Sequence, residues 1–358
     1  MARWRPEPAQ AAQQTRAPRR ITGILLALLP SFLAAAESPP YFLRNHSPFL
    51  HGFGLPALEG GVLTSPGSFN SRIAVSFVNH ADSSETANEA VVLDGESYYV
   101  DTILRYGLGE RWEVGLDLPY VSHRNGKLDN LIEGWHDVFG LDNSEREGPS
   151  NHLQLTYRRA GIIRADVRDG GGGIGDVRVT SAYRLLSMDQ GERTLALRGL
   201  LKLPTGNEER LRGSGATDMA LSLEATEHAT LAGRAMALTG QVGAIRLGDG
   251  ELLPDAQKNT VPFAALGAMW RWSPALDLRV QLAVQGKYFD SALAEIGGST
   301  ATVAVGGAFH LRRLGLEVDI ALIEDLISDA TPDFGLYVSV GRNPTRSAGP
   351  PTARRGSP

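Results

Sequence analysis

The sequence predicts an antiparallel transmembrane β-barrel of about 12 strands, and three observations carry this prediction. Many segments alternate apolar and polar residues, which places the two kinds of side chain on opposite faces of a strand. The connections between these segments are alternately short and long, as in barrels with short periplasmic turns and long extracellular loops. The chain also opens with a secretory signal, and it then has no apolar run of about 18 residues that would predict a transmembrane helix.

Residues 1–36 are predicted to be a signal peptide. A basic stretch ending at Arg20 precedes an apolar run over residues 21–33, and an Ala-x-Ala cleavage site ends at Ala36. The apolar run is too short and too interrupted for a membrane anchor. We therefore expect cleavage after Ala36, a periplasmic N-terminal segment over residues 37–67, and export to the outer membrane.

Twelve segments have the alternation expected of barrel strands. An even number of strands returns both ends of the barrel to the periplasm. The barrel is expected over residues 68–342, followed by a disordered tail rich in Pro, Arg, Ser and Gly at 343–358. The segments are Ser68–Asn79, Tyr98–Tyr106, Trp112–Tyr120, Asp176–Leu185, Thr194–Leu203, Asp218–Thr226, Gly233–Ile245, Val261–Trp272, Leu276–Tyr288, Ala301–Leu311, Leu314–Leu322 and Asp333–Arg342.

The faces of these strands predict a charged interior and an aromatic exterior. Two successive strands carry a basic lumen wall of Arg178, Arg184, Arg198 and Lys202, and other strands carry the acidic lumen groups Asp101, Glu113, Asp117, Glu317 and Asp319. Such charges either line an open, selective channel or pair across a narrow interior and plug it. Aromatic girdles at the two membrane interfaces are expected from Tyr98, Tyr106, Trp112, Tyr120, Trp270, Trp272 and Tyr288.

The longest connection, at about residues 121–173, predicts a helix and a hairpin inserted at the mouth. A mouth-loop helix follows from the helical spacing of Leu128, Leu131, Ile132, Trp135 and Phe139, with His136 and Asp137 among them. Alternation then resumes from Leu153 to Val167, which predicts a hairpin that either extends two strands outward or folds over the mouth. If the hairpin crosses the membrane, the strand number rises to about 14.

Composition excludes several classes of function. There is no cysteine, so a disulfide framework, a thiol nucleophile and a thiolate metal site are impossible, and we expect no metal or cofactor. The net charge of −5 gives no basic footprint for nucleic acid. The glycine-rich stretch at 169–175 lacks the Lys-Ser/Thr of a phosphate-binding loop.

Five groups of residues resemble the Gram-negative domain-of-unknown-function family numbered 3187. They are Arg44–Phe49 with Phe53–Pro56, Arg105–Gly109 with Trp112–Tyr120, Gly134–Leu141, Gly173–Val177 and Leu201–Gly206. The last two groups are also similar to outer-membrane transporters of the phenol-degradation type. The resemblance covers nearly the whole mature chain and implies an outer-membrane barrel, but it assigns no activity, so no functional residue is carried over.

The function expected first is therefore a channel or transporter for small solutes rather than an enzyme. A barrel-embedded hydrolase is the first rival, resting on His123 at a strand end and on His136 and Asp137. A structural or adhesive barrel with a plugged lumen is the second rival. The partners expected are outer-membrane lipid and lipopolysaccharide, the barrel-insertion machinery and a small solute.

Overall fold

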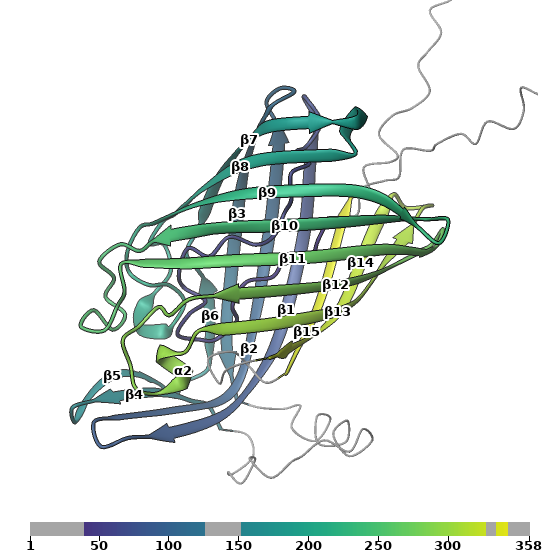
Figure 1. Ribbon diagram of the computed structural model, residues 1–358. Helices are drawn as coiled ribbons and strands as arrows, with labels where there is room; N and C mark the ends of the chain where they lie inside the picture. The colour runs from purple at the N-terminus through teal and green to yellow at the C-terminus, as the bar shows by residue number, and fades with distance from the viewer. Residues whose placement is uncertain (1–38, 126–151, 327–333, 343–358) are drawn as a thin grey trace, which may run out of the picture. The chain divides into compact units, whose positions relative to one another are not determined.

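Twelve strands close into a single antiparallel ring in the computed structural model, which describes residues 39–125, 152–326 and 334–342 (Figure 1). The ring closes where the last strand pairs with the first, with Ile73 opposite Val340. Its strands are β1 (Phe69–Glu85), β2 (Glu89–Gly107), β3 (Trp112–Arg124), β7 (Arg178–Met188), β8 (Arg193–Lys202), β9 (Asp218–Leu231), β10 (Arg234–Arg246), β11 (Thr260–Ser273), β12 (Leu276–Gln285), β13 (Thr300–Leu311), β14 (Leu316–Asp325) and β15 (Phe334–Arg342). The predicted fold and the number of 12 strands are confirmed.

Side chains on each strand alternate between the outside and the inside of the ring, as the sequence pattern predicts. Met219, Val242 and Leu266 point outward and are 60%, 59% and 65% exposed. Arg198 and Gln281 point inward and are almost fully buried. The barrel therefore presents an apolar outer band and a polar inner wall, which is the pattern of a barrel surrounded by lipid.

The connections lie at two ends, which we call the short-turn end and the long-loop end. The short turns cover residues 108–111, 189–192, 232–233, 274–275 and 312–315. In the tightest of them, Ala232 and Gly233 have φ of 52° and 73°, as a two-residue hairpin turn requires. Longer connections at the other end include residues 203–217, 247–259 and 286–299, with the 3-10 helix η2 (Glu208–Arg210) in the first and α2 (Ala294–Gly297) in the third.

Residues 80–97, which lie between the first two predicted strands and were therefore expected to form a long loop, do not form one. Strands β1 and β2 stay paired up to Glu85 opposite Ala90, so only residues 86–88 turn. The sequence pattern misses this extension because residues 80–85 are largely polar on both faces and therefore show no alternation.

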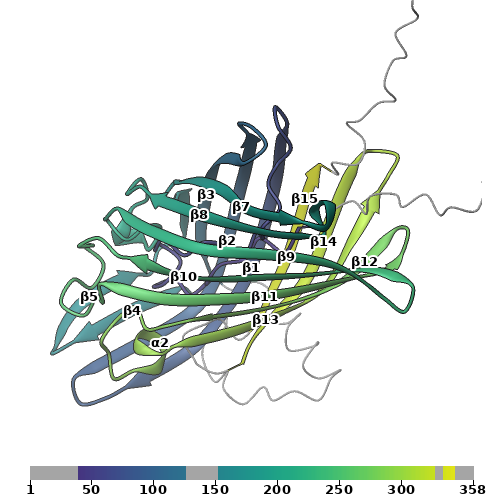
Figure 2. The ribbon, with the colours of Figure 1, turned by 45° about the horizontal axis from the view of Figure 1, so that its top comes forward.

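The predicted hairpin in the 121–173 insertion is present but lies outside the ring. Strands β4 (Gln154–Arg159) and β5 (Ile162–Val167) form it, and β4 pairs with the extension of β2 (Figure 2). A further short strand, β6 (Gly171–Ile174), pairs with the end of β3. The alternative of 14 barrel strands is therefore wrong, because the hairpin widens the sheet beyond the ring instead of entering it. The predicted mouth-loop helix lies outside the described residues.

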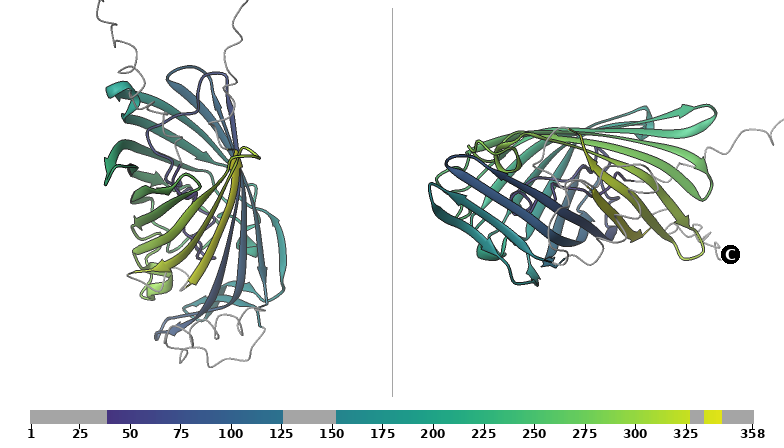
Figure 3. Two further views of the ribbon diagram at one scale, coloured as in Figure 1. Left: turned by 90° about the vertical axis from the view of Figure 1, so that its right-hand side faces the viewer. Right: turned by 90° about the horizontal axis from the view of Figure 1, so that it is seen from below.

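The N-terminal segment fills the inside of the barrel (Figure 3). Residues 39–64, called the plug below, run in irregular conformation through the ring of strands, and most of their side chains are buried. This segment therefore lies inside the barrel, and not outside it on the periplasmic side as the sequence led us to expect. Among the described residues, no helix has the length and apolar composition needed to cross a membrane.

Candidate functional site

The plug enters and leaves the barrel at the same end. Its first leg starts in the short-turn half, where Tyr41 lies beside Arg279 near the start of β12, 5.7 Å from the guanidinium to the ring centre. Its tip reaches the long-loop end, where Phe53 packs on Tyr288 with ring centres 5.1 Å apart. Its second leg returns to the short-turn end and continues into β1 at Phe69. The plug is therefore a re-entrant loop rather than a strand that spans the barrel.

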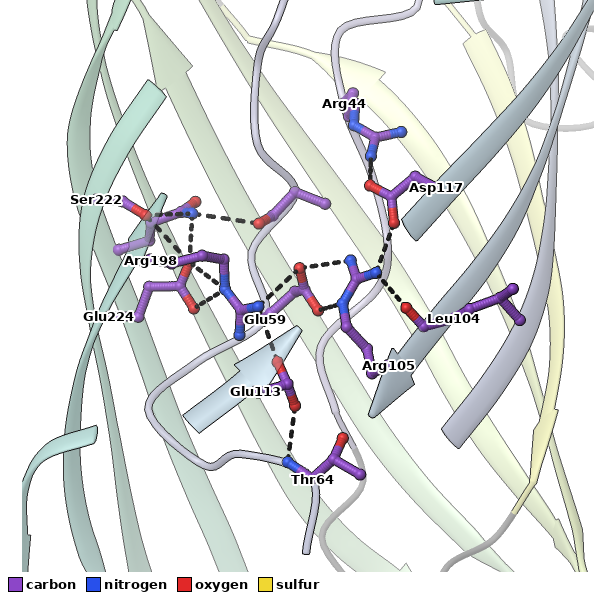
Figure 4. A network of polar contacts seen from close by, with 12 residues as sticks. Arg44, Glu59, Thr64, Leu104, Arg105, Glu113, Asp117, Arg198, Ser222 and Glu224 are labelled. Carbon is purple, nitrogen blue, oxygen red and sulfur yellow. Dashed lines mark hydrogen bonds and ion pairs between the residues drawn. The ribbon is translucent and has the colours of Figure 1, made fainter. Parts of the chain in front are cut away.

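Two charged side chains of the plug hold it to the wall at mid-barrel (Figure 4). Arg44 donates to Asp101 at 2.9 Å and to Asp117 at 2.6 Å. Glu59 accepts two hydrogen bonds from Arg105, at 2.7 and 2.8 Å, and lies 3.5 Å from Arg198. Paired, hydrogen-bonded geometry of this kind is what allows charges to be buried.

Three of the four residues of the predicted basic wall point into the barrel, and each of the three forms ion pairs or hydrogen bonds there. Arg198 pairs with Glu113 at 2.9 Å and with Glu224 at 3.1 Å. Lys202 and Arg178 lie closer to the long-loop end, where Arg178 donates to two backbone carbonyls of the plug. Arg184 is on the same face of β7 but lies at its short-turn end, just before a register shift, and donates to the backbone of the neighbouring turn.

All five predicted acidic lumen groups are buried inside the barrel. Glu317 and Asp319 form a second cluster with Arg72 and Arg279, two arginines that are not among the predicted lumen charges. Arg72 stands on the polar face of β1 and Arg279 on the polar face of β12, so the alternation itself could have found both. The charges of the lumen thus pair locally around the ring rather than forming opposed walls of opposite sign.

The two less specific motifs of the family resemblance meet around Asp176. Its carboxylate accepts from Lys202 Nζ at 2.6 Å, from the Gly206 N–H at 2.8 Å and from the Ser214 N–H at 3.1 Å. In the same place the Thr205 hydroxyl donates to the Gly175 carbonyl. This shared network ties the residues just before β7, in the group Gly173–Val177, to the loop after β8, in the group Leu201–Gly206.

An apolar cap closes the long-loop end. It joins the plug tip to the loops and to the β4–β5 hairpin, and its buried members include Phe49, Leu50, Phe53, Leu155, Tyr157, Leu211, Leu247, Leu252, Tyr288, Phe289 and Ile296. Two cavities between the plug and the wall hold only about 30 and 20 Å³, which is room for one or two water molecules each.

Burial and neighbouring charges shift the pKa of two side chains of the plug, Glu59 and His46. Burial alone would raise the pKa of the Glu59 carboxyl, but Arg105 and Arg198 outweigh it and lower that pKa to about 2. Burial lowers the pKa of the His46 imidazole to about 4, with Asp101 opposing the shift and Arg44 adding to it. At neutral pH the plug therefore has a charged Glu59 and a neutral His46.

Six of the seven predicted girdle aromatics stay near the outer surface, and one does not. Tyr106, Trp112, Tyr120 and Trp272 are exposed, and Tyr98 and Trp270 are half-buried. Tyr288 is fully buried, because alternation ends at Gln285 and its ring turns into the apolar cap. The prediction that Tyr288 belongs to a girdle is therefore wrong.

The residues of the hydrolase hypothesis do not assemble at the rim. His123 is 2% exposed and faces inward, where one ring nitrogen contacts Ser97 Oγ at 2.7 Å and the other contacts the Leu211 carbonyl at 3.2 Å. His136 and Asp137 lie outside the described residues. Within those ranges, no group of three or more His, Asp or Glu side chains is arranged to hold a metal ion.

Comparisons with known proteins agree with this architecture. The model of the family described as "Protein of unknown function (DUF3187)" matches residues 19–342 and confirms the resemblance seen in the sequence. No curated protein matches the chain. Among solved structures, the COG4313 outer membrane channel from Pseudomonas putida F1 superposes with a TM-score of 0.50 at 16% identity, over 79% of this chain and 97% of that one.

Two other solved structures resemble the barrel more loosely. The NanC porin gives a TM-score of 0.41 at 9% identity, over 76% of this chain and 98% of that one. The P. putida toluene transporter TodX gives 0.39 at 12% identity, over 86% and 95%. At 16% identity, the likeness to the COG4313 channel concerns the fold alone, which is that of an outer-membrane β-barrel.

Proposed function

Because this chain belongs to the DUF3187 family and forms an outer-membrane β-barrel, we propose that it is a gated channel for small solutes, with the plug as its gate. One observation carries the proposal. A polar, charged wall surrounds a lumen that is filled by a separate segment of chain, not by the wall's own side chains. Withdrawal of the plug would leave a lumen lined with charge, which suits the passage of ions or polar solutes.

The path of the plug makes such withdrawal simple. Both of its ends lie at the short-turn end, which is the periplasmic side if this barrel follows the usual orientation. A re-entrant loop can leave by that mouth without threading any chain through the barrel. A barrel that served only as an anchor would not need a charged wall behind a plug that can leave. We therefore favour the channel over the structural barrel.

A reversible cross-link tests the proposal. A Cβ built at Gly267 of β11 lies 3.9 Å from the Cβ of Pro40 in the first leg, within the range of disulfides. The natural chain has no cysteine, so the variant Pro40→Cys/Gly267→Cys contains only this pair. Planar-bilayer recordings in potassium chloride should show channel openings in reductant, none after oxidation, and openings again after renewed reduction.

The controls separate the channel from its rival. Each single-cysteine variant should open equally under both conditions. Openings that persist in the oxidised double variant would show that the first leg does not move, and would refute the plug as gate. A correctly folded wild-type barrel that stays silent at every voltage and salt concentration would favour the plugged structural barrel.

A further inference from the structure

The wall holds the plug mainly by its main chain. At the tip of the plug, Arg178 Nη2 donates to the carbonyls of His51 and Phe53 at 3.0 and 3.2 Å. Asp218 accepts from the Gly54 N–H at 2.9 Å. These contacts bind peptide groups, so they do not depend on which side chains the plug carries.

The same kind of contact continues toward the short turns. Gln241 donates to the Ala57 carbonyl at 3.2 Å, Thr226 accepts from the Gly61 N–H at 3.1 Å, and Glu113 accepts from the Thr64 N–H at 2.7 Å. The first leg adds the Tyr99 hydroxyl, which donates to the His46 carbonyl at 2.8 Å. All these wall residues are at most 8% exposed, so each would be left without its partner if the lumen were simply emptied.

Two side-chain sites complete this surface. The carboxylates Asp101 and Asp117 form an acidic site that is occupied by Arg44. The guanidinium groups of Arg105 and Arg198 form a basic site that is occupied by Glu59. An extended peptide with an acidic residue that followed the path of the second leg would meet the same main-chain partners and the basic site.

We infer that the lumen is a binding site for extended peptides, which compete with the plug for the same wall groups, and that peptides are the solutes of this channel. The inference rests on the proposed function, since it requires the plug to leave. Sugars of similar size have hydroxyls rather than amide groups at the spacing and orientation of a main chain, so they would leave several of these buried wall groups without well-oriented partners. The plug would then occupy the binding site with the same kind of main-chain contacts that the ligand makes.

The test uses a reporter for plug release in the full chain. Ser47 in the plug tip is 2% exposed, and its hydroxyl has no hydrogen-bond partner among the described residues. The variant Ser47→Cys therefore places a single buried thiol in a chain that has no other, and maleimide labels it only when the plug leaves. The rate of labelling is measured in detergent-solubilised full-length protein.

Three peptides and one sugar distinguish the outcomes. The first peptide has the sequence of residues 51–64, the second is its scrambled version, and the third has N-methyl groups on the amides of Gly54, Gly61 and Thr64. At ten times its Kd, a peptide that binds only the unplugged barrel raises the unplugged population, and hence the labelling rate, about tenfold. The scrambled peptide should act similarly, whereas the methylated peptide, having lost about tenfold in affinity or more, should raise the rate about twofold or less. A maltooligosaccharide of similar mass should have no effect.

Several results would overturn the inference. Equal action of the methylated and unmethylated peptides would exclude main-chain recognition. Action of the authentic peptide alone would mean a latch specific for the plug, and no action of any peptide would mean that the lumen does not bind them. If Ser47→Cys is labelled and channels open in the cross-link experiment, such a failure concerns only the ligand; if the reduced channel never opens, the proposed function itself fails.

Discussion

Replacing Glu59 by Gln should loosen the plug by an amount that the geometry allows us to estimate. Glu59 accepts two charge-assisted hydrogen bonds from Arg105 and faces Arg198. Gln keeps the shape but loses the charge, and one of its terminal atoms becomes a donor that faces a guanidinium. Hydrogen bonds to charged groups contribute about 1.5–3 kcal/mol each. Arg105 keeps Asp117 and Arg198 keeps two carboxylates, so we expect a loss of about 2–3 kcal/mol rather than the larger cost of an abandoned charge.

That loss corresponds to an increase of about 30- to 150-fold in the unplugged population, at 1.4 kcal/mol for each factor of ten. The assay is the rate of maleimide labelling in the Ser47→Cys background, compared with and without Glu59→Gln. The matched control is Glu192→Gln, which neutralises an exposed carboxylate on the turn after β7. A rate that rises no more with Glu59→Gln than with Glu192→Gln would refute the idea that this ion pair holds the plug.

Three further changes probe other parts of the molecule. Phe53→Ala removes the ring that packs on Tyr288 and Phe289, and it should cost about 3–5 kcal/mol of cap stability, seen as faster labelling of Ser47→Cys without loss of the barrel's circular dichroism. Leu266→Arg puts a charge at mid-strand on the outer band and should cost about 2–4 kcal/mol of folding into liposomes, whereas the same change at Leu314, in a short turn, should cost about 0–1 kcal/mol. Acidification should also release the plug. Burial lowers the pKa of His46 from 6.5 to about 4, so the plugged state loses stability as the pH drops from 6.5 toward 4. The open probability should therefore rise over that range, and it should rise less steeply in His46→Asn. A flat pH response, or equal folding of both arginine variants, would contradict the corresponding argument.

The barrel could be predicted from the sequence because its information is local. Alternation places Arg198 on the inner face and Leu266 on the outer face without any knowledge of a partner strand. The same local rule identified every acidic lumen group and three of the four basic wall residues. It did not show that Arg184 lies at the rim of the short-turn end, where its side chain meets the neighbouring turn, or that the strand ends before Tyr288.

The plug could not be predicted in the same way, because its position is decided by long-range contacts. Residues 39–64 have neither strand nor helix periodicity, and their hydrogen bonds go to side chains up to 295 positions away. One signal was available nonetheless. The segment combines many apolar residues, among them Phe49 and Phe53, with the isolated charges Arg44 and Glu59, a composition that favours burial over exposure to the periplasm.

The re-entrant plug also dictates an order of assembly. It is the first of the described segments to be made, yet it hydrogen-bonds to Tyr337 in the last strand to be made. Its binding surface is complete only after β15 has been made, so the contact of the plug with Tyr337 is among the last that can form. A molecule whose ring has closed before the plug is fully seated would have a hydrated lumen and, as the channel proposed above, would leak.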